Sequence, residues 1–363
     1  MAPNESHKST KKPKKTILVA PLHWGLGHAT RCIPLIESLV ENGYDVLLGS
    51  DGAALMFLQK EFPELPSLTL PAYNITYTKK GSFFKWKMLA KLPDIKKTMK
   101  AERRVVAELV SQNIIQGIIS DNRMGVYHKD IPCVYITHQL NVLSGKTSFV
   151  STKLHQKIIS KYEECWVPDV SGPINLSGKL GHLQHSSLPL KYIGPLSRMS
   201  KKNLQKKYDI LCLLSGPEPQ RSLLEEKLIS EFHKTNKRVA LVRGVVEDLA
   251  TVKTNKNITE FNFLGTRALE VLIGESELVV SRSGYTTIMD LAALQKPAFF
   301  IPTPGQFEQE YLAKRLKKQG LVPSCKQEKF TVKKLEKVKL YKGLGGFSKT
   351  EDYSPLFSLF EGK

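Results

Sequence analysis

The strongest constraint on this chain is that short apolar runs and helix-like segments alternate along it in two successive series. The runs are continuous and do not alternate with polar residues, which is typical of parallel strands covered on both faces. Between the runs, apolar residues recur at helical spacing, as over 33–40. The predicted strands of the first series are 17–20, 46–48, 118–119, 134–136 and 165–167.

Residues 168–196 interrupt this pattern, because they are rich in Gly, Ser, Pro and His and weak in periodicity. We interpret them as a connector. The predicted strands of the second series are 210–214, 239–242, 258–263, 278–280 and 298–301, and its predicted helices are 220–232, 267–273, 286–294 and 308–319. Two such series of similar size predict an α/β protein with two doubly wound, Rossmann-like domains that face each other across a central cleft.

This organisation divides the 363 residues into four parts. We expect residues 1–16 to form a disordered basic tail. We place the N-terminal domain at 17–195 and the C-terminal domain at 196–340, and we expect 341–363 to pack back on the N-terminal domain. Ligands of such sheets bind at the carboxyl ends of the strands, so the loops that follow the strands carry the functional information.

The charge of the chain implies an anionic partner. Lys and Arg number 54 against 34 Asp and Glu, a net charge of +20, while a 41% hydrophobic content is ordinary for a globular protein. The partner could be a nucleic acid, a membrane surface or a phosphorylated ligand. Lysine is concentrated in the tail, over 79–104 and over 326–342.

Several protein classes are excluded by the sequence. The longest apolar runs, at 17–22 and 297–302, fall short of the roughly 18–20 residues of a transmembrane helix, and residues 1–16 lack the apolar core of a signal peptide. The cysteines are odd in number and form no CxxC pair, which argues against a disulfide framework or a zinc site and predicts a cytoplasmic protein. They are Cys32, Cys133, Cys165, Cys212 and Cys325.

The loop after the first predicted strand combines glycines with a base and a cation. Gly25 and Gly27 allow a close approach of a ligand, and the following helix start favours an anion. His28 could deprotonate a hydroxyl, and Arg31 adds a fixed positive charge. The alternative for the Gly-x-Gly fragment is a tight turn without a ligand.

Other loops carry polar residues to the same cleft. Asp121 and Asn122 follow the strand at 118–119, and His138 follows the strand at 134–136; simple turns are the alternative for both loops. In the second domain, hydroxyls and N–H groups at helix starts suit a diphosphate, although Ser and Thr there could be plain helix caps. The candidates in that domain are Ser215, Gly216, Arg243, Arg282, Ser283, Gly284, Thr286, Thr287, Asp290, Gln309 and Glu310.

These motifs in this order resemble the GT-B glycosyltransferases. Within them, the chain is similar to the bacterial family 28 enzymes that move N-acetylglucosamine from UDP to a lipid-linked acceptor of peptidoglycan. The resemblance covers most of residues 17–335, and its more specific part extends over about thirty positions of the C-terminal half. The matching residues are Gly25, Leu26, Gly27, His28, Ser281 to Asp290, Ala292, Ala293, Pro297, Gln309 and Glu310.

The resemblance implies a role for each matching residue. Phe263 and Leu264 match a segment that contacts uracil, Asp290 a ribose contact, and Gln309 and Glu310 the donor sugar. Ser283, Gly284, Thr287, Ser215 and Gly216 match phosphate loops, and Gly27 and His28 lie near donor and acceptor. The chain departs from the family pattern at Pro217 and Pro219, where small residues are expected, and at Asp290, where Glu is usual.

The predicted reaction is the transfer of an N-acetylhexosamine or a hexose from a UDP-sugar to a membrane-associated or cell-envelope acceptor. His28 or Asp121 would take the acceptor proton, and Arg31, Asn122 and His138 would lie on the acceptor side. GT-B enzymes generally stabilise the leaving diphosphate without a metal, and the sequence holds no DxD motif, so no cofactor is expected. Arg243, Arg282 and Thr286 would supply charge and hydrogen bonds.

Two alternatives stay open. The pattern Gly25-x-Gly27-His28-x-x-Arg31 also resembles nucleotide-sugar hydrolases of nonulosonic-acid synthesis, in which the acceptor is water. Residues 79–104 contain ten Lys or Arg and several aromatics, which favours peripheral contact with an anionic membrane surface. Nucleic-acid binding through the same residues is the alternative of another class, but no nucleic-acid motif accompanies them.

Overall fold

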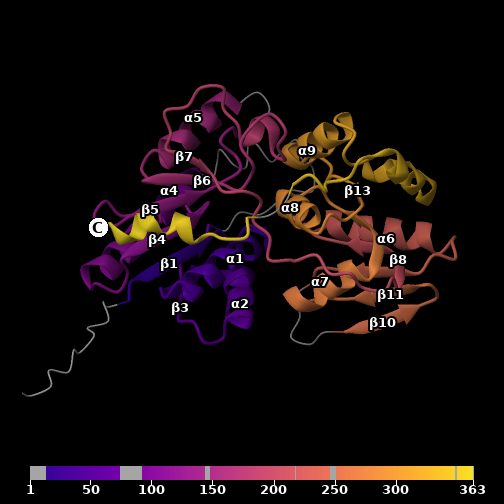
Figure 1. The fold of residues 1–363 in the computed structure, drawn as a ribbon, viewed down its shortest axis with the longest axis horizontal. Helices are drawn as coiled ribbons and strands as arrows, with labels where there is room; N and C mark the ends of the chain where they lie inside the picture. The colour runs from indigo at the N-terminus through magenta and orange to yellow at the C-terminus, as the bar shows by residue number, and fades with distance from the viewer. Residues whose placement is uncertain are drawn as a thin grey trace, which may run out of the picture.

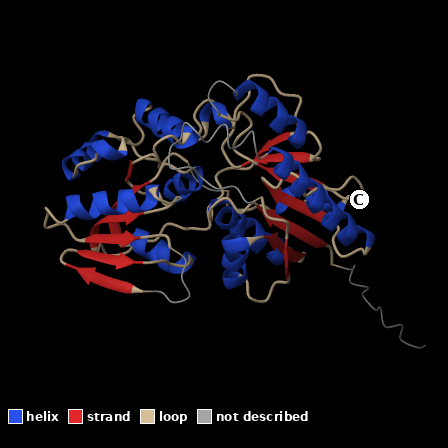
Figure 2. Ribbon diagram, turned by 180° about the vertical axis from the view of Figure 1, so that it is seen from behind, coloured by secondary structure: helices blue, strands red, loops and turns tan. Residues whose placement is uncertain are grey.

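The computed structural model describes residues 14–73, 92–143, 148–216, 218–245, 251–347 and 350–362. Two α/β halves lie side by side, each with a twisted sheet covered by helices (Figure 1; Figure 2 shows the same halves from behind). Their sheets are built from separate parts of the chain, residues 16–192 and 208–300. The predicted two-domain α/β fold is therefore confirmed.

The first sheet has seven strands in the order β3-β2-β1-β4-β5-β6-β7, and its neighbours all pair in parallel. Its central strands are buried on both faces, which explains their continuous apolar sequences. The strands are β1 (Thr16–Pro21), β2 (Asp45–Ser50), β3 (Ser67–Thr69), β4 (Gly117–Asp121), β5 (Cys133–Ile136), β6 (Glu164–Val167) and β7 (Leu190–Tyr192).

Helices connect these parallel strands. The predicted helix at 33–40 is the apolar part of α1, which starts earlier, at Gly27. Three further helices, α2, α4 and α5, and the short edge strands β3 and β7 were not predicted. The core-facing apolar residues of α4 stand among many lysine and arginine residues, and the larger apolar side chains of α5 are exposed. The helices of this half are α1 (Gly27–Glu41), α2 (Gly52–Glu61), α4 (Leu92–Ser111), α5 (Ser148–Ile159) and the 3₁₀ turn η3 (Gly178–Leu180).

The second sheet has six strands in the order β10-β11-β9-β8-β12-β13, and only the edge strand β10 runs antiparallel to its neighbour. Its strands are β8 (Tyr208–Leu213), β9 (Val239–Val242), β10 (Val252–Asn255), β11 (Ile258–Phe261), β12 (Ser276–Ser281) and β13 (Ala298–Phe300). Its helices are α6 (Gln220–Phe232), α7 (Thr266–Gly274), α8 (Tyr285–Ala293), α9 (Phe307–Lys318), and the 3₁₀ segments η4 (Gln327–Lys329) and η5 (Val332–Leu340).

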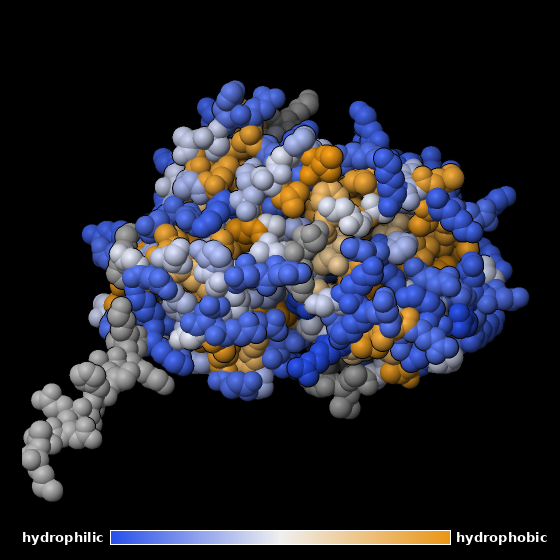
Figure 3. All heavy atoms as spheres, in the orientation of Figure 1, coloured by the Kyte–Doolittle hydropathy of each residue, from blue (hydrophilic) through white to orange (hydrophobic). Residues whose placement is uncertain are grey.

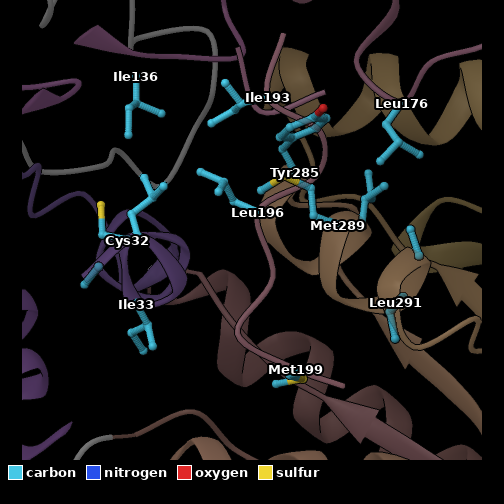
Figure 4. Packing of buried hydrophobic residues seen from close by; sticks show 14 of the residues in the cluster. Cys32, Ile33, Ile136, Leu176, Ile193, Leu196, Met199, Tyr285, Met289 and Leu291 are labelled. Atoms are coloured by element: carbon cyan, nitrogen blue, oxygen red, sulfur yellow. The ribbon is translucent and has the colours of Figure 1, made fainter. Parts of the chain in front are cut away.

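An apolar core continues between the two halves. Cys32 and Ile33 of α1 and Tyr285 and Met289 of α8 belong to one buried cluster, together with Leu196 of the connector (Figure 4). Burial of apolar surface stabilises contacts by about 25 cal/mol per Å². The helices that begin at the cleft edge of each sheet are thus packed against each other.

The end of the chain returns to the first half. It forms η6 (Ser354–Leu356) and α10 (Ser358–Glu361), which lie beside the first sheet at the left of Figure 1. The ring of Phe357 packs edge-on against Tyr44 with centroids 5.8 Å apart, and Lys15 donates to the carbonyl of Phe360 at 2.6 Å. The C-terminal segment therefore covers the N-terminal domain. Within the described ranges, the helices are all too short or too polar to cross a membrane.

Candidate active site

A cluster of charged and imidazole side chains lies where β1 and β4 end. His28 stands in the first turn of α1, and its Nδ1 lies 2.9 Å from Oδ1 of Asp121, the last residue of β4. Arg31, one turn further along α1, donates to both carboxylate oxygens, from Nε to Oδ2 at 2.5 Å and from Nη2 to Oδ1. Asp121 and Arg31 are buried, whereas the His28 ring is partly exposed. The accessible group of this cluster is therefore the His28 imidazole.

The surroundings of His28 keep it uncharged. Burial lowers its pKa below the ordinary value, and the Asp121 carboxylate offsets only part of this effect. Burial alone would raise the pKa of Asp121, but Arg31 and His28 together bring it well below its usual range. Nδ1 of His28 lies 2.9 Å both from Oδ1 of ionised Asp121, which can only accept, and from Nη2 of Arg31, which can only donate. Because Nη2 of Arg31 also donates to Oδ1 of Asp121, we assign the proton of neutral His28 to Nδ1, where it bonds the carboxylate. Nε2 then carries a lone pair that can take a proton.

A second imidazole extends the cluster into the other domain. His138, in the loop after β5, has Nδ1 3.2 Å from Nη1 of Arg31 and Nε2 2.9 Å from Oε1 of Glu308. Because Arg31 can only donate, Nδ1 of His138 accepts, and Nε2–H donates to Glu308. Gln139 donates to Oε2 of the same carboxylate. Burial would raise the pKa of Glu308, but His138 lowers it below its ordinary value. Since Glu308 lies on α9, these bonds join the two domains.

Two helix N-termini meet beside this cluster. Thr286, in the first turn of α8, donates from Oγ1 to the carbonyl of Gly27, the first residue of α1, at 3.2 Å. A Cβ on Gly27 would lie only 2.9 Å from that hydroxyl, so a larger residue does not fit without movement. The ring of Tyr285 stacks on His138 with centroids 4.1 Å apart. The first N–H groups of a helix lack partners within the helix, so two converging N-termini suit an anion.

The loops at the carboxyl end of the second sheet are held by their own side chains. Ser283 donates to the carbonyl of Gln309 at 2.8 Å, and Oε1 of Gln309 accepts from the N–H of Thr303 at 2.9 Å. Glu310 accepts from the N–H of Gly305 at 2.9 Å. These bonds fix the start of α9 against the start of α8. The expected donor residues that lie around the start of α8 are Ser283, Gly284, Thr286 and Thr287.

The structure gives Arg282 a role other than the expected direct contact with the donor. Its side chain is buried and donates to the carbonyls of Ile301 at 3.1 Å, Pro302 at 3.2 Å and Gln220 at 2.7 Å. Burial lowers the pKa of this guanidinium to about 10. Arg282 therefore ties β12 to the loop after β13 and to the start of α6.

Three expected nucleoside contacts lie on the side of the domain near the connector. Asp290 accepts from the hydroxyl of Ser197 at 2.7 Å, and burial raises its pKa to about 6. The ring of Phe263 packs edge-on against Phe57 of α2 with centroids 6.4 Å apart, and Leu264 packs on the same core. Phe57 belongs to the N-terminal domain, so this expected base site also borders the interface of the domains.

The remaining expected residues lie in open or strained loops. Ser215 and Gly216, directly after β8, are exposed, and Gly216 adopts a φ of 102°, which favours glycine. Arg243, after β9, is ion-paired with Glu225, Nε to Oε1, at 2.7 Å. Asn122 adopts a φ of 58°, and its amide lies 3.4 Å from Oδ1 of Asp121. These residues keep exposed or partly exposed positions along the cleft edges of their sheets.

The family comparison agrees with the C-terminal half of this site. Residues 220–343 match the model of the glycosyltransferase family 28 C-terminal domain. This span includes the starts of α8 and α9, which contact the N-terminal cluster. An uncharacterized glycosyltransferase of Methanosarcina acetivorans is 22% identical over 322 residues, 82% of each chain. A segment of 69 residues, 18% of this chain and 19% of the relative, is 39% identical to the UDP-N-acetylglucosamine–N-acetylmuramyl-(pentapeptide) pyrophosphoryl-undecaprenol N-acetylglucosamine transferase of Methylobacterium radiotolerans.

Solved structures agree with the fold over nearly the whole chain. The MurG structure of Acinetobacter baumannii aligns with a TM-score of 0.56 at 13% identity, covering 97% of this chain and 100% of that one. The calicheamicin glycosyltransferase CalG4 aligns with a TM-score of 0.63 at 12% identity, covering 97% and 99%. The chain is a GT-B glycosyltransferase. The predicted resemblance to the peptidoglycan N-acetylglucosaminyltransferases is confirmed, whereas a bacterial source stays a prediction.

Three residues of the candidate site, Glu308, Gln139 and Tyr285, lie in loops that the sequence pointed to but were not predicted as site residues. All three act across the domain interface, where no local pattern marks a partner. A signal for Glu308 existed, because it directly precedes Gln309 and Glu310, which the resemblance assigned to the donor sugar. Among the described residues of the glycosyltransferase, no group of three or more His, Cys, Asp or Glu could hold a metal ion.

Proposed function

We propose that the protein transfers a sugar from a UDP-sugar to a membrane-associated or cell-envelope acceptor, with His28 as general base. The observation that carries this proposal is the His28–Asp121 pair at the start of α1, beside the start of α8. In this arrangement, a neutral imidazole lies beside two helix N-termini. A base and an anion site are the two groups that sugar transfer from a nucleotide diphosphate needs.

The proposed reaction begins with an acceptor hydroxyl next to Nε2 of His28. The imidazole takes the hydroxyl proton, and the acceptor oxygen attacks the anomeric carbon of the donor sugar. The bond from that carbon to the β-phosphate oxygen breaks, and the electron pair leaves with UDP. Asp121 stabilises the imidazolium that forms, because its carboxylate lies 2.9 Å from Nδ1.

The leaving diphosphate would be stabilised by the protein alone. The N-termini of α1 and α8 supply backbone N–H groups, and Thr286, Ser215 and Arg243 supply hydroxyls and charge. We therefore expect addition of a chelator such as EDTA to leave the transfer rate unchanged. A rate that EDTA abolishes and Mg²⁺ restores would contradict this part of the proposal.

The acceptor would bind on the N-terminal domain. The 39% identical segment links the chain to a relative named for a pyrophosphoryl-undecaprenol acceptor, which supports a lipid-linked substrate. Much of the basic and aromatic segment 79–104 lies outside the described residues, but α4 exposes Lys96, Lys97, Lys100 and Arg104. We propose that the protein works in the cytoplasm, peripherally on the inner face of a membrane.

Thermal-shift measurements with a panel of nucleotides and nucleotide sugars test the donor. Stabilisation by UDP and one UDP-sugar, with none by other nucleoside diphosphates, is expected. Stabilisation by a different nucleotide, or by none, would contradict the UDP-sugar proposal. Oligonucleotides added to the same panel test nucleic-acid binding. Such binding would raise the melting temperature by an amount that added UDP does not reduce.

Hydrolysis of a nucleotide sugar is the second candidate. It is favoured by Arg31, which completes the pattern shared with nucleotide-sugar hydrolases and holds Asp121 in this structure. In that case, His28 would deprotonate water. Release of free sugar from the donor at an unchanged rate with and without added acceptor would support hydrolysis, whereas acceptor-dependent UDP release would support transfer.

A further inference from the structure

Thr303, in the loop between β13 and α9, carries a buried hydroxyl group without a hydrogen-bond partner. The residue is 6% exposed, and its Oγ1 makes no hydrogen bond to any residue that the structure describes. Many hydrophilic side chains of the protein face solvent, as the blue areas of Figure 3 show, and water can hydrogen-bond them there. The Thr303 hydroxyl loses its bonds to water and gains none in return, so its burial destabilises the ligand-free protein.

The backbone of Thr303 is fixed by hydrogen bonds. Its N–H donates to Oε1 of Gln309 at 2.9 Å, and its carbonyl accepts from the N–H of Gln306 at 3.1 Å. The carbonyl of Gln309 in turn accepts from the hydroxyl of Ser283, beside the start of α8, at 2.8 Å. Both backbone groups of Thr303 are therefore satisfied, and the hydroxyl alone is left for a ligand.

This hydroxyl faces the open side of Gly216 in the loop after β8. A Cβ on Gly216 would lie 3.9 Å from Oγ1 of Thr303, and apart from the adjoining residues of the chain no other described atom lies within 4 Å of that point. The loop after β12 repeats the arrangement, since a Cβ on Gly284 would meet only Oγ1 of Thr287, at 3.9 Å. Gly284 and Thr287 are expected phosphate contacts, so the same pairing of glycine and hydroxyl marks Gly216 and Thr303 as a second one.

A buried positive charge lies between the loops after β8 and β13. These strands flank β12 in the sheet, and Arg282 directly follows β12. Its guanidinium donates to the carbonyls of Ile301 and Pro302 on one side and of Gln220, at the start of α6, on the other. These three partners are neutral and do not balance its charge. A buried cation in neutral surroundings favours an anion nearby.

We propose that Thr303 binds the β-phosphate of the donor and stabilises it as the leaving group. Its hydroxyl donates a hydrogen bond to a β-phosphate oxygen that lies over Gly216, where the missing Cβ leaves room, and the charge of Arg282 attracts the diphosphate. Negative charge on this phosphate grows as its bond to the sugar breaks, so the hydrogen bond is strongest in the transition state. The inference rests on the proposed function, to which it adds a donor-binding residue.

Thr303→Val separates this role from a structural one, because valine keeps the shape of the side chain and removes the hydroxyl. The melting temperature of the ligand-free variant should rise by roughly 2–4 °C, since an unpaired buried group is lost. Its affinity for UDP, measured by calorimetry, should fall by about 10–100-fold, the equivalent of one hydrogen bond to a charged group. Thr303→Ser keeps the hydroxyl and should restore most of the affinity.

Thr235→Val is the matched control. Thr235 lies beyond the end of α6, away from the loop after β8, and its hydroxyl donates to the carbonyl of Phe232 at 2.9 Å. Its replacement should lower the melting temperature of the ligand-free protein and leave the affinity for UDP unchanged. A Thr303→Val variant that behaves in the same way, with a lower melting temperature and unchanged UDP affinity, overturns the proposal.

Smaller ligands locate the contact. UMP lacks the β-phosphate, so Thr303→Val should bind it as the wild type does. Pyrophosphate lacks the nucleoside and should lose affinity as UDP does. An equal loss for UMP would place the contact at the nucleoside or the α-phosphate, and a loss for a UDP-sugar without a loss for UDP would place it at the sugar. Either result overturns the proposal.

The same titrations distinguish failure of this inference from failure of the proposed function. If the wild type binds UDP and a UDP-sugar, and Thr303→Val binds both as tightly, only the inference about Thr303 fails. If the wild type binds pyrophosphate more tightly than Thr303→Val does but binds no uridine nucleotide, the phosphate contact stands and the UDP-sugar proposal fails.

Discussion

Two imidazole–carboxylate pairs lie in the candidate active site, and they differ in what holds them. His28 and Asp121 both belong to the N-terminal domain, and Arg31 fixes the carboxylate from the same helix as His28. His138 and Glu308 are 170 positions apart and come from different domains. The first pair is complete whenever its domain is folded. The second pair forms only when the domains are in contact, so it reports and supports that contact.

Arg31 is the element that the two pairs share. Its Nε and Nη2 donate to the Asp121 carboxylate. Its Nη1 lies 3.2 Å from Nδ1 of His138. A shift of α9 that moves Glu308 would therefore reach Asp121 through two buried side chains. We interpret His28 as the candidate catalytic residue and Glu308 as a positioning residue that acts through His138.

The largest expected effect tests the pair within one domain. His28→Ala should lower kcat/KM for sugar transfer by about 10²–10⁴-fold, because a general base contributes that much. The thermal shift caused by the donor should stay near that of the wild type, because the proposed diphosphate site includes helix N-termini but not the His28 ring. Unaltered turnover would remove the assignment of His28 as base.

Asp121→Asn should lower both activity and stability. It leaves the buried Arg31 guanidinium without its carboxylate, and breaking a buried ion pair costs about 3–5 kcal/mol in the free energy of unfolding. Chemical denaturation measures that loss. His28→Ala is the control, and its free energy of unfolding should lie closer to that of the wild type. A destabilisation equal in both variants would contradict the separate roles of the two residues.

Substitutions in the His138–Glu308 pair, which joins the two domains, should lower kcat/KM less than His28→Ala does. Glu308→Ala removes the acceptor of His138, and we expect kcat/KM to fall by about 10–100-fold, the equivalent of one hydrogen bond to a charged group. Glu308→Gln should recover part of the loss, because an amide oxygen can still accept. Small-angle scattering should show a wider separation of the domains for Glu308→Ala than for the wild type or Glu308→Gln. If Glu308→Ala loses activity while the domain separation stays unchanged, Glu308 does more than position His138.

The smallest expected effect is a shift of the pH profile. His28 acts as a base only when neutral, and burial lowers its pKa below the ordinary value, so kcat/KM should fall to half of its maximum at a pH below about 6.5, the ordinary pKa of histidine. In Asp121→Asn the carboxylate that raises this pKa is absent, so the acid limb of the profile should move to still lower pH. An acid limb above pH 6.5 would contradict a buried neutral His28.

The sequence predicted much of the fold because buried parallel strands have a local signature. The apolar runs at 134–136 and 239–242, for example, coincide with β5 and β9 within a residue. It also predicted that His28, Asp121 and His138 would share a cleft, because each follows a strand whose carboxyl end must face it. It failed for α2, α4 and α5. In α4 the core-facing residues Ile95, Met99, Val106 and Leu109 recur at helical spacing but stand among many lysine and arginine residues, and α5 exposes its larger apolar side chains.

The sequence by itself determined the two α/β domains, the loops that border the cleft and the basic character of the surface, since apolar periodicity and charge are local properties. Only the tertiary structure decided which side chains pair. It buried Arg282 among three backbone carbonyls, and it brought Glu308 to His138. The physical reason is that such hydrogen bonds join loops distant in sequence, whose relative positions follow from the packing of α1 against α8.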